Sequence, residues 1–94
     1  MSAIDDVVRE ECAKSPEFAA EYHKEVERLD AALALVKLRD EEGMTQRQFA
    51  AATGKTQSTI ARIENGNMNP SIKLLREIAE ALGRKLEFRF VKVG

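Results

Sequence analysis

The chain has 94 residues, of which 44% are hydrophobic and 33% charged, and its formal net charge is −1. This length and mixture predict one compact domain with a small soluble core, and they exclude wholesale disorder. The apolar runs are shorter than the roughly 18–20 residues that span a bilayer, and the acidic start is unlike a secretory signal. The single cysteine, Cys12, excludes an internal disulfide and fits a reducing compartment, so we expect a cytoplasmic protein.

Acidic and basic residues are segregated along the chain. Residues 1–30 contain nine acids and four bases, whereas residues 31–94 contain eleven bases and seven acids. Between residues 43 and 76, five bases accompany one acid, Glu64. A polyanion is therefore attracted to the middle of the chain, and a basic protein to its first third. Two solvated faces without any partner would give the same pattern, and charge alone does not decide between these readings.

The first third predicts two helices. Residues 5–13 have apolar positions at helical spacing, and the start Ser15-Pro16-Glu17 combines a cap, a first-turn proline and an acid at the positive helix end. From there no helix breaker occurs before Gly43, which predicts a helix roughly 40 Å long. The alternatives of one straight helix, whose first half projects as an arm, and two helices with a bend near Leu29 both remain open. The apolar residues of this long segment form one stripe: Phe18, Tyr22, Val26, Leu29, Leu33 and Val36.

Three shorter helices follow. Thr45 and Gln48 form a capping box for a helix over residues 45–53 that ends at Gly54. Thr56 caps the next helix, which closes at residues 64–67. Another helix starts at residues 69–71 and ends at Gly83. Phe49, Ala50, Ile60 and Ile63 are expected to face the core.

Residues 85–93 have the alternation of a β-strand, because Leu86, Phe88 and Phe90 alternate with Glu87 and Arg89. An isolated strand leaves its backbone groups unpaired, so we expect a partner strand from a second copy or from another protein. Leu86, Phe88 and Phe90 are therefore the candidate dimerisation residues. A tail that packs loosely on the helices is the alternative.

The segment Gly54-Lys55-Thr56 has two interpretations. It matches the end of a nucleotide-binding phosphate loop, but that motif requires a glycine where this chain has Phe49, and a strand where the pattern is helical. The second interpretation is a helix-turn-helix, in which Gly54 provides the positive φ of the turn and small Ala50 allows the helices to cross closely. We therefore favour a DNA-binding role.

In this arrangement the second short helix reads bases. Gln57 and Ser58 lie on its first turn, and Arg62 lies one turn beyond Ser58. The first turns of a recognition helix approach base edges in the major groove, where glutamine suits adenine and arginine suits guanine.

Residues 43–83 resemble the phage-repressor (Cro/cI, or XRE) helix-turn-helix family in Thr45-Gln46, Ala50, Gly54, Thr56-Gln57, Ile60, Ile63-Glu64-Asn65-Gly66, Asn69-Pro70-Ser71 and Ala81-Leu82-Gly83. Thr53 and Lys55 depart from it, since those places are usually or often apolar. The resemblance implies a mainly α, lambda-repressor-like bundle. The helix and strand patterns described above add a long N-terminal helical extension and one C-terminal β-strand to it. The resemblance also implies base-reading residues (Gln57, Ser58, Thr59 and Arg62) and phosphate-contacting residues (Gln46, Arg47, Lys55, Thr56, Asn65, Asn67 and Asn69), with Gln46 bracing Gln57. Helix capping alone is the alternative role for Gln46, Thr56 and Asn65.

The whole chain is similar to the HigA-type antitoxins of bacterial toxin–antitoxin pairs, through its Ser15-Pro16-Glu17-Phe18 start, long acidic helix, XRE domain and Leu86–Phe90 tail. This resemblance implies a homodimeric repressor on a palindromic operator, which controls its own operon and neutralises a basic RelE/HigB-like ribonuclease toxin. Residues 4–36 would hold the toxin, with Phe18, Tyr22 and Val26 as apolar anchors. A free-standing XRE regulator, whose long helix only dimerises, is the alternative.

These expectations divide the chain into an acidic helical extension (1–30), a helix-turn-helix domain (31–83) and a C-terminal dimerisation strand (84–94). We expect no enzyme activity, cofactor or metal site. The single histidine, His23, and Cys12 lie eleven residues apart with no recognisable third group, so neither predicts a nucleophile or a metal ligand. Nucleoid-associated DNA and the toxin are the expected partners, with no membrane role.

Overall fold

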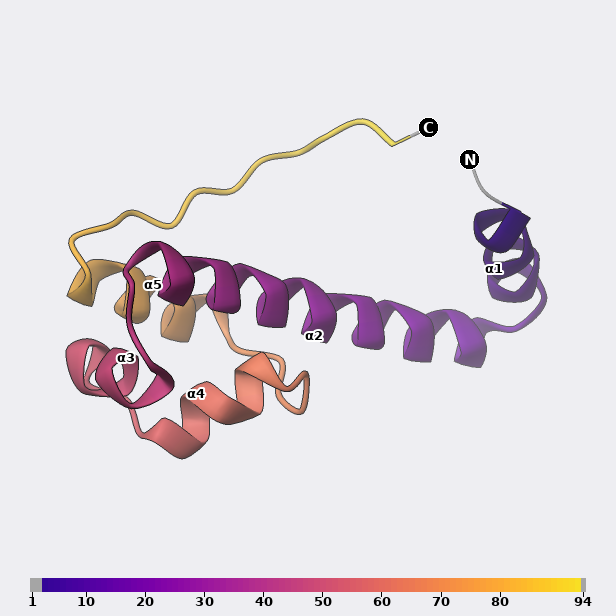
Figure 1. Cartoon of the computed structure of the whole chain (residues 1–94). Coiled ribbons are helices and arrows are strands. Elements are labelled where there is room, and N and C mark those ends of the chain that lie inside the picture. The colour runs from indigo at the N-terminus through magenta and orange to yellow at the C-terminus, as the bar shows by residue number, and fades with distance from the viewer. Residues whose placement is uncertain (1–2, 94) are drawn as a thin grey trace.

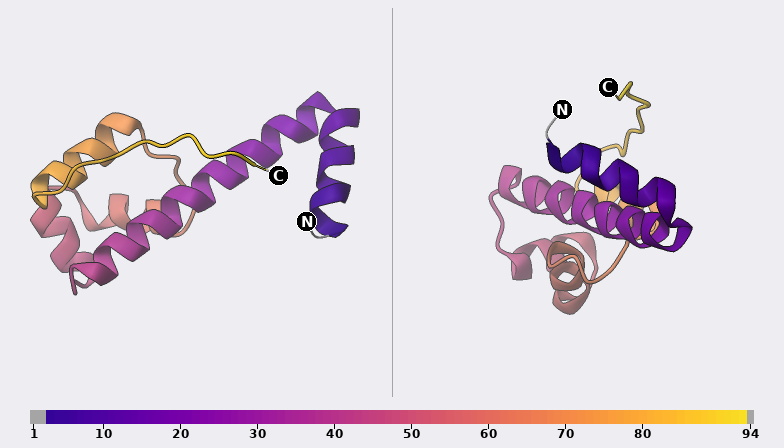
Figure 2. Two further views of the ribbon diagram at one scale, coloured as in Figure 1. Left: turned by 90° about the horizontal axis from the view of Figure 1, so that it is seen from above. Right: turned by 90° about the vertical axis from the view of Figure 1, so that its right-hand side faces the viewer.

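The computed structural model describes residues 3–93, and within them five helices follow one another along the chain (Figure 1). Their bounds are α1 (Ala3–Lys14), α2 (Pro16–Glu41), α3 (Gln46–Thr53), α4 (Gln57–Glu64) and α5 (Ile72–Ala81). The molecule is elongated, with extents of 45 × 26 × 22 Å. Helices α3, α4 and α5 gather around the C-terminal half of α2, as both further views confirm (Figure 2).

Helix α2 settles the question of one helix or two. It begins after Ser15, whose side-chain oxygen accepts a hydrogen bond from the Phe18 N–H at 3.1 Å, and it continues for 26 residues through Leu29 without a break. At 1.5 Å per residue this is about 39 Å, longer than the bundle beside it. The N-terminal half of α2 therefore projects as an arm, and α1 packs against its far end (Figure 1).

The core forms where α2 meets the three short helices. Phe49, Ile60, Ile63 and Ile78 are less than 2% exposed, and Leu35 of α2 packs among them. This confirms the expected inward positions of Phe49, Ala50, Ile60 and Ile63. Buried Thr53 replaces an apolar residue without loss of hydrogen bonding, because its hydroxyl donates to the Phe49 carbonyl at 2.8 Å.

The predicted stripe of α2 does not enter this core. The helix buries Ala32 and Leu35 instead, while Leu29 and Leu33 stay 57% and 61% exposed. Ala31, Ala32, Leu35 and Leu38 recur every three or four residues and form the core-facing side. Helix α2 is therefore apolar on two sides, and only one of them is covered in the described chain.

The predicted C-terminal strand over residues 85–93 is wrong. No residue from 3 to 93 is in a strand, and the segment after α5 runs as an extended tail (Figure 1). The side chains alternate as in a strand, but a strand also needs backbone hydrogen bonds to a neighbour, and the described chain offers none. Leu86 is half-buried near α2 and α5, whereas Phe88 and Phe90 are exposed. The helical part of the predicted fold stands without the strand.

None of the helices in residues 3–93 combines the length and the apolar character that crossing a bilayer requires.

Candidate nucleic-acid interface

Helices α3 and α4 are joined by a turn that glycine makes feasible. The capping box at the start of α3 is present, with the Gln48 N–H donating to the Thr45 hydroxyl at 3.1 Å and the Thr45 N–H donating to the Gln48 side chain at 2.9 Å. At the other end Gly54 has φ 69°, and the Lys55 N–H donates to the Ala50 carbonyl at 3.1 Å. A side chain is strained at this φ, so the sharp reversal between the helices depends on Gly54.

Helix α4 presents its first turns to solvent. Its N-cap is Thr56, whose hydroxyl oxygen accepts a hydrogen bond from the Thr59 N–H at 3.1 Å and donates to the Thr59 hydroxyl at 2.9 Å. Ile60 and Ile63 anchor the opposite side of α4 in the core. Of the four expected base-reading residues, Gln57, Ser58 and Arg62 are exposed and Thr59 is half-buried. The structure thus presents them from one rigid, capped helix.

A partly buried ion pair fixes the end of this helix. The Arg39 Nε of α2 lies 3.1 and 3.0 Å from the two carboxylate oxygens of Glu64, and a terminal nitrogen adds a contact of 2.9 Å. The Glu64 side chain is only 3% exposed, and hydrogen bonding to it raises the pKa of Arg39 above its ordinary value. Arg39 also donates to the Met44 carbonyl at 3.1 Å, which ties together α2, the start of α3 and the end of α4.

Sequence reasoning did not predict this pair. Glu64 is the one acid in residues 43–76, and it directly follows Ile63, which is expected to face the core. If such an acid is buried beside the core, its charge needs a cation as partner. That signal could have led to Arg39.

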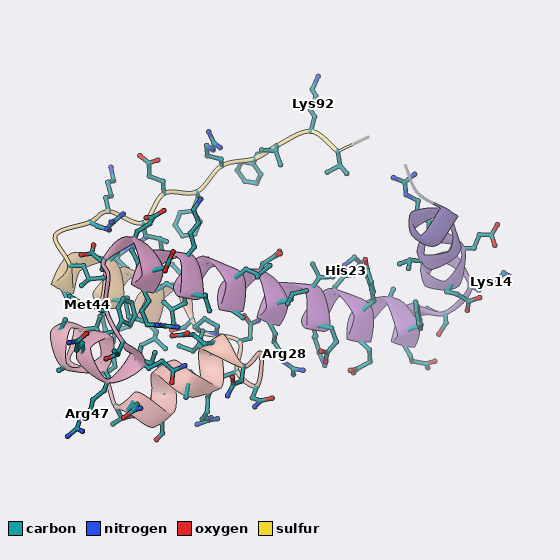
Figure 3. The ribbon with its side chains drawn as sticks, in the orientation of Figure 1. Lys14, His23, Arg28, Met44, Arg47 and Lys92 are labelled. Atoms are coloured by element: carbon teal, nitrogen blue, oxygen red, sulfur yellow. The ribbon has the colours of Figure 1, made fainter. Side chains whose placement is uncertain are left out.

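The expected phosphate-contacting residues surround the exposed side of the motif. Arg47 points away from the bundle at the start of α3 (Figure 3). The exposed members of this set are Arg47, Thr56, Asn65, Asn67 and Asn69, and the half-buried ones are Gln46 and Lys55. Gly66, with φ 72°, turns the chain between Asn65 and Asn67. Donors from both helices and from the loop after α4 can therefore reach one polyanion.

Three of these donors are engaged by carboxylates. The Gln46 amide donates to a Glu64 oxygen at 3.4 Å, which places it beside the Arg39–Glu64 pair. Lys55 forms an ion pair with Glu77 of α5, and this hydrogen bond lowers the pKa of the Glu77 carboxyl.

The third engaged donor is Asn69, whose amide donates to Glu27 of α2 at 2.9 Å. A DNA phosphate has to compete with Glu77 for Lys55 and with Glu27 for Asn69. The contact between Glu27 and Asn69 also links the arm to the loop that follows α4.

The arm carries the three residues expected to bind a toxin. Phe18 and Tyr22 are 41% and 37% exposed, and their rings lie nearly parallel with centroids 6.4 Å apart. Val26 is half-buried and lines an open groove of about 440 Å³ together with Tyr22, Leu29 and the turn Asn65-Gly66. Tyr22 and Val26 therefore lie next to the end of the recognition helix, and Phe18 lies one turn further along the arm.

The described residues contain no group of three or more His, Cys, Asp or Glu side chains placed to hold a metal ion. His23 is exposed and rests edge-on against the Tyr22 ring, with centroids 5.8 Å apart.

Comparison with known proteins agrees with this geometry. The helix-turn-helix family profile matches residues 35–88, more than half of the chain. An uncharacterised HTH-type transcriptional regulator of Sinorhizobium fredii, y4dJ, is 40% identical over 47 residues, which are 50% of this chain and 61% of that protein. HTH-type regulators of Methanothermobacter thermautotrophicus and Archaeoglobus fulgidus are 45% and 37% identical over 47 and 49 residues, covering 50% and 52% of this chain and 68% and 70% of theirs.

The matched region thus spans less than two thirds of the first relative. No solved structure gives a significant match. The residues that the family profile matches include the capped α3, the glycine turn, the exposed first turns of α4 and the Arg39–Glu64 pair. The match confirms the resemblance to the XRE type. The chain therefore belongs to the helix-turn-helix family of DNA-binding transcriptional regulators.

Proposed function

We propose that the protein is a homodimeric repressor that binds a palindromic operator on cytoplasmic, nucleoid-associated DNA and controls the operon encoding it. The observation that carries this proposal is the first turns of α4, where Gln57, Ser58 and Arg62 are exposed on a helix anchored by Ile60, Ile63 and Glu64. Side chains that read bases must be exposed while their helix is held rigidly.

Electrostatics support the same surface. The segment from residue 43 to 76 has five bases, and its one acid, Glu64, is neutralised by Arg39 inside the protein. A DNA backbone that approaches α4 therefore meets exposed Arg47 and Arg62 without opposition from Glu64.

A gel-shift titration with the DNA upstream of the gene tests this function. Because a dimer of such motifs reads two half-sites, we expect one specific complex on a palindromic site with half-sites about one helical turn apart. Arg62→Ala should remove the preference at one base pair of each half-site. Equal affinity for the upstream DNA and for scrambled DNA would contradict the proposal.

A second function, that of an antitoxin, has its own supporting observation. The arm exposes the stacked rings of Phe18 and Tyr22 on a helix half that also carries Glu17, Glu21 and Glu25. Apolar anchors with an acidic surround suit a basic partner, in this proposal a RelE/HigB-like ribonuclease toxin. A free-standing regulator needs no such surface.

Co-expression with the adjacent gene separates these two readings. We expect a small basic protein to co-purify with the chain, and the variant Phe18→Ser to release it while operator binding persists. As a matched control, Ile72→Ser removes an exposed apolar residue of α5, which is not part of the arm. Absence of any such neighbouring gene, or unchanged co-purification of the variant, would favour the free-standing regulator.

A further inference from the structure

The uncovered side of α2 has the spacing of a coiled-coil seam. Its residues are separated by four, three, four and three positions, an average of 3.5 residues: Tyr22, Val26, Leu29, Leu33 and Val36. A helix that only covers a globular core follows a period of 3.6, and the strict alternation of four and three is typical of a seam that packs on another helix. The core-facing residues Ala32 and Leu35 lie outside this seam.

The described chain leaves the seam open. Leu29 is 57% exposed and Leu33 is 61% exposed, whereas the main core of the protein buries only a few side chains as large as leucine. The helix that carries them is straight and continuous, so the seam is preformed. An exposed apolar row of this length on an ordered helix indicates an interaction surface.

We infer that this seam pairs with the same seam of a second copy, with the two α2 helices antiparallel, and that the pairing is the dimer interface. The inference rests on the proposed dimeric function, for which it names the surface. A self-complementary row of apolar side chains satisfies a two-fold interface with one surface patch.

Charges beside the seam determine the direction. In a parallel pair, residues at the two flanking positions of the heptad meet across the interface, which brings Glu25 of each copy against Asp30 of the other. That repulsion would occur twice by symmetry. An antiparallel pair does not bring these two positions together, so the repulsion between Glu25 and Asp30 is absent.

The position of the seam agrees with operator binding. The groove at Tyr22, Val26 and Leu29 borders Asn65 and Gly66, which directly follow the recognition helix α4. Pairing through α2 therefore connects the two recognition helices through rigid elements and fixes their separation. The tail is not part of this interface, and the interface needs no β-strand.

The first test is the oligomeric state of the full chain by sedimentation equilibrium. Leu33→Glu places a carboxylate in the seam, so we expect dimerisation to weaken by more than about tenfold. Ile72→Glu is the matched control, because Ile72 is 54% exposed and belongs to α5 and not to the seam. Thermal unfolding of both variants checks that they fold. A wild-type monomer, or a Leu33→Glu protein that dimerises like wild type, would overturn the inference.

The second test measures direction. A spin label on Glu17→Cys in a Cys12→Ser background reports the distance between the arms of the two copies. Antiparallel helices place these labels more than roughly 30 Å apart, and parallel helices place them within about 20 Å. A short distance would refute the antiparallel arrangement.

Gel shifts keep this inference separate from the proposed function. If Leu33→Glu remains dimeric and still binds the operator, the seam is wrong and the repressor function stands. If the wild-type chain binds no specific DNA, the repressor function fails, and the sedimentation result still decides whether the seam pairs.

Discussion

The partly buried pair between Arg39 and Glu64 gives the sharpest stability prediction. Replacing Arg39 with Met keeps an apolar stem of similar length but removes all three contacts of 2.9–3.1 Å to Glu64. The carboxylate, whose side chain is 3% exposed, then keeps only the 3.4 Å contact from Gln46. Removing one partner of a fully buried pair costs about 3–5 kcal/mol, because the other charge remains buried without compensation. The Arg39 side chain is 24% exposed, so we expect a cost near the lower end of that range.

The exposed pair between Glu25 and Arg28 is the matched control. Its nitrogen–oxygen distance of 2.8 Å is equally short, but its side chains are 66% and 36% exposed. We therefore expect Arg28→Met to lower the free energy of unfolding by no more than about 1 kcal/mol. Urea denaturation followed by circular dichroism measures both variants. An Arg39→Met cost as small as that of Arg28→Met would refute the claim that Glu64 depends on Arg39.

A double variant separates the pair from its surroundings. If Arg39→Met is destabilising because Glu64 is left charged and buried, Arg39→Met/Glu64→Met should recover most of the loss, since two packed apolar residues can replace a buried pair. A double variant as unstable as Arg39→Met alone would mean that the lost contact to the Met44 carbonyl, and not the orphaned carboxylate, explains the cost.

Four further predictions concern the DNA surface, the Lys55–Glu77 pair and the tail. Arg62→Ala should cost about 1–3 kcal/mol at one base position and relax the preference there; an unchanged preference in competition gel shifts would remove Arg62 from base reading. Lys55→Ala should weaken binding to all sequences similarly and lower the slope of log affinity against log salt by about one, and an identical slope would contradict its role as a phosphate contact. Because Lys55 lowers the pKa of Glu77, the pair stabilises the fold above the ordinary carboxyl pKa of 4.5 and loses that contribution as the pH falls below it, so Glu77→Gln should show a shallower acid loss of stability in urea titrations. Deleting the chain from Phe88 onward should leave the dimer intact in light scattering, and a monomer would place the dimer interface in the tail.

Local signals in the sequence were sufficient for the helices and the DNA-reading surface. The caps Ser15, Thr45 and Thr56 and the turn at Gly54 depend on residues within four positions of each other, so their structures followed from the sequence. The same holds for the exposure of Gln57 and Ser58 at the start of α4.

Features that depend on distant residues could not be predicted in this way. The prediction of a strand over residues 85–93 failed because alternation fixes which side chains share a face and does not provide the partner that a strand needs. The Arg39–Glu64 pair joins residues 25 positions apart, and the Lys55–Glu77 pair joins residues 22 apart. Which side of α2 enters the core also depended on contacts that periodicity cannot assign, because the helix is apolar on both sides.

The central claim is that α4 reads a specific DNA sequence, and selection of bound fragments from a random DNA pool tests it most directly. The purified chain should enrich a palindromic sequence whose half-sites are about one helical turn apart, and the Gln57→Ala chain should lose the preference at one position of each half-site. Selection that enriches no sequence, or the same sequence with equal strength for both proteins, would contradict the account.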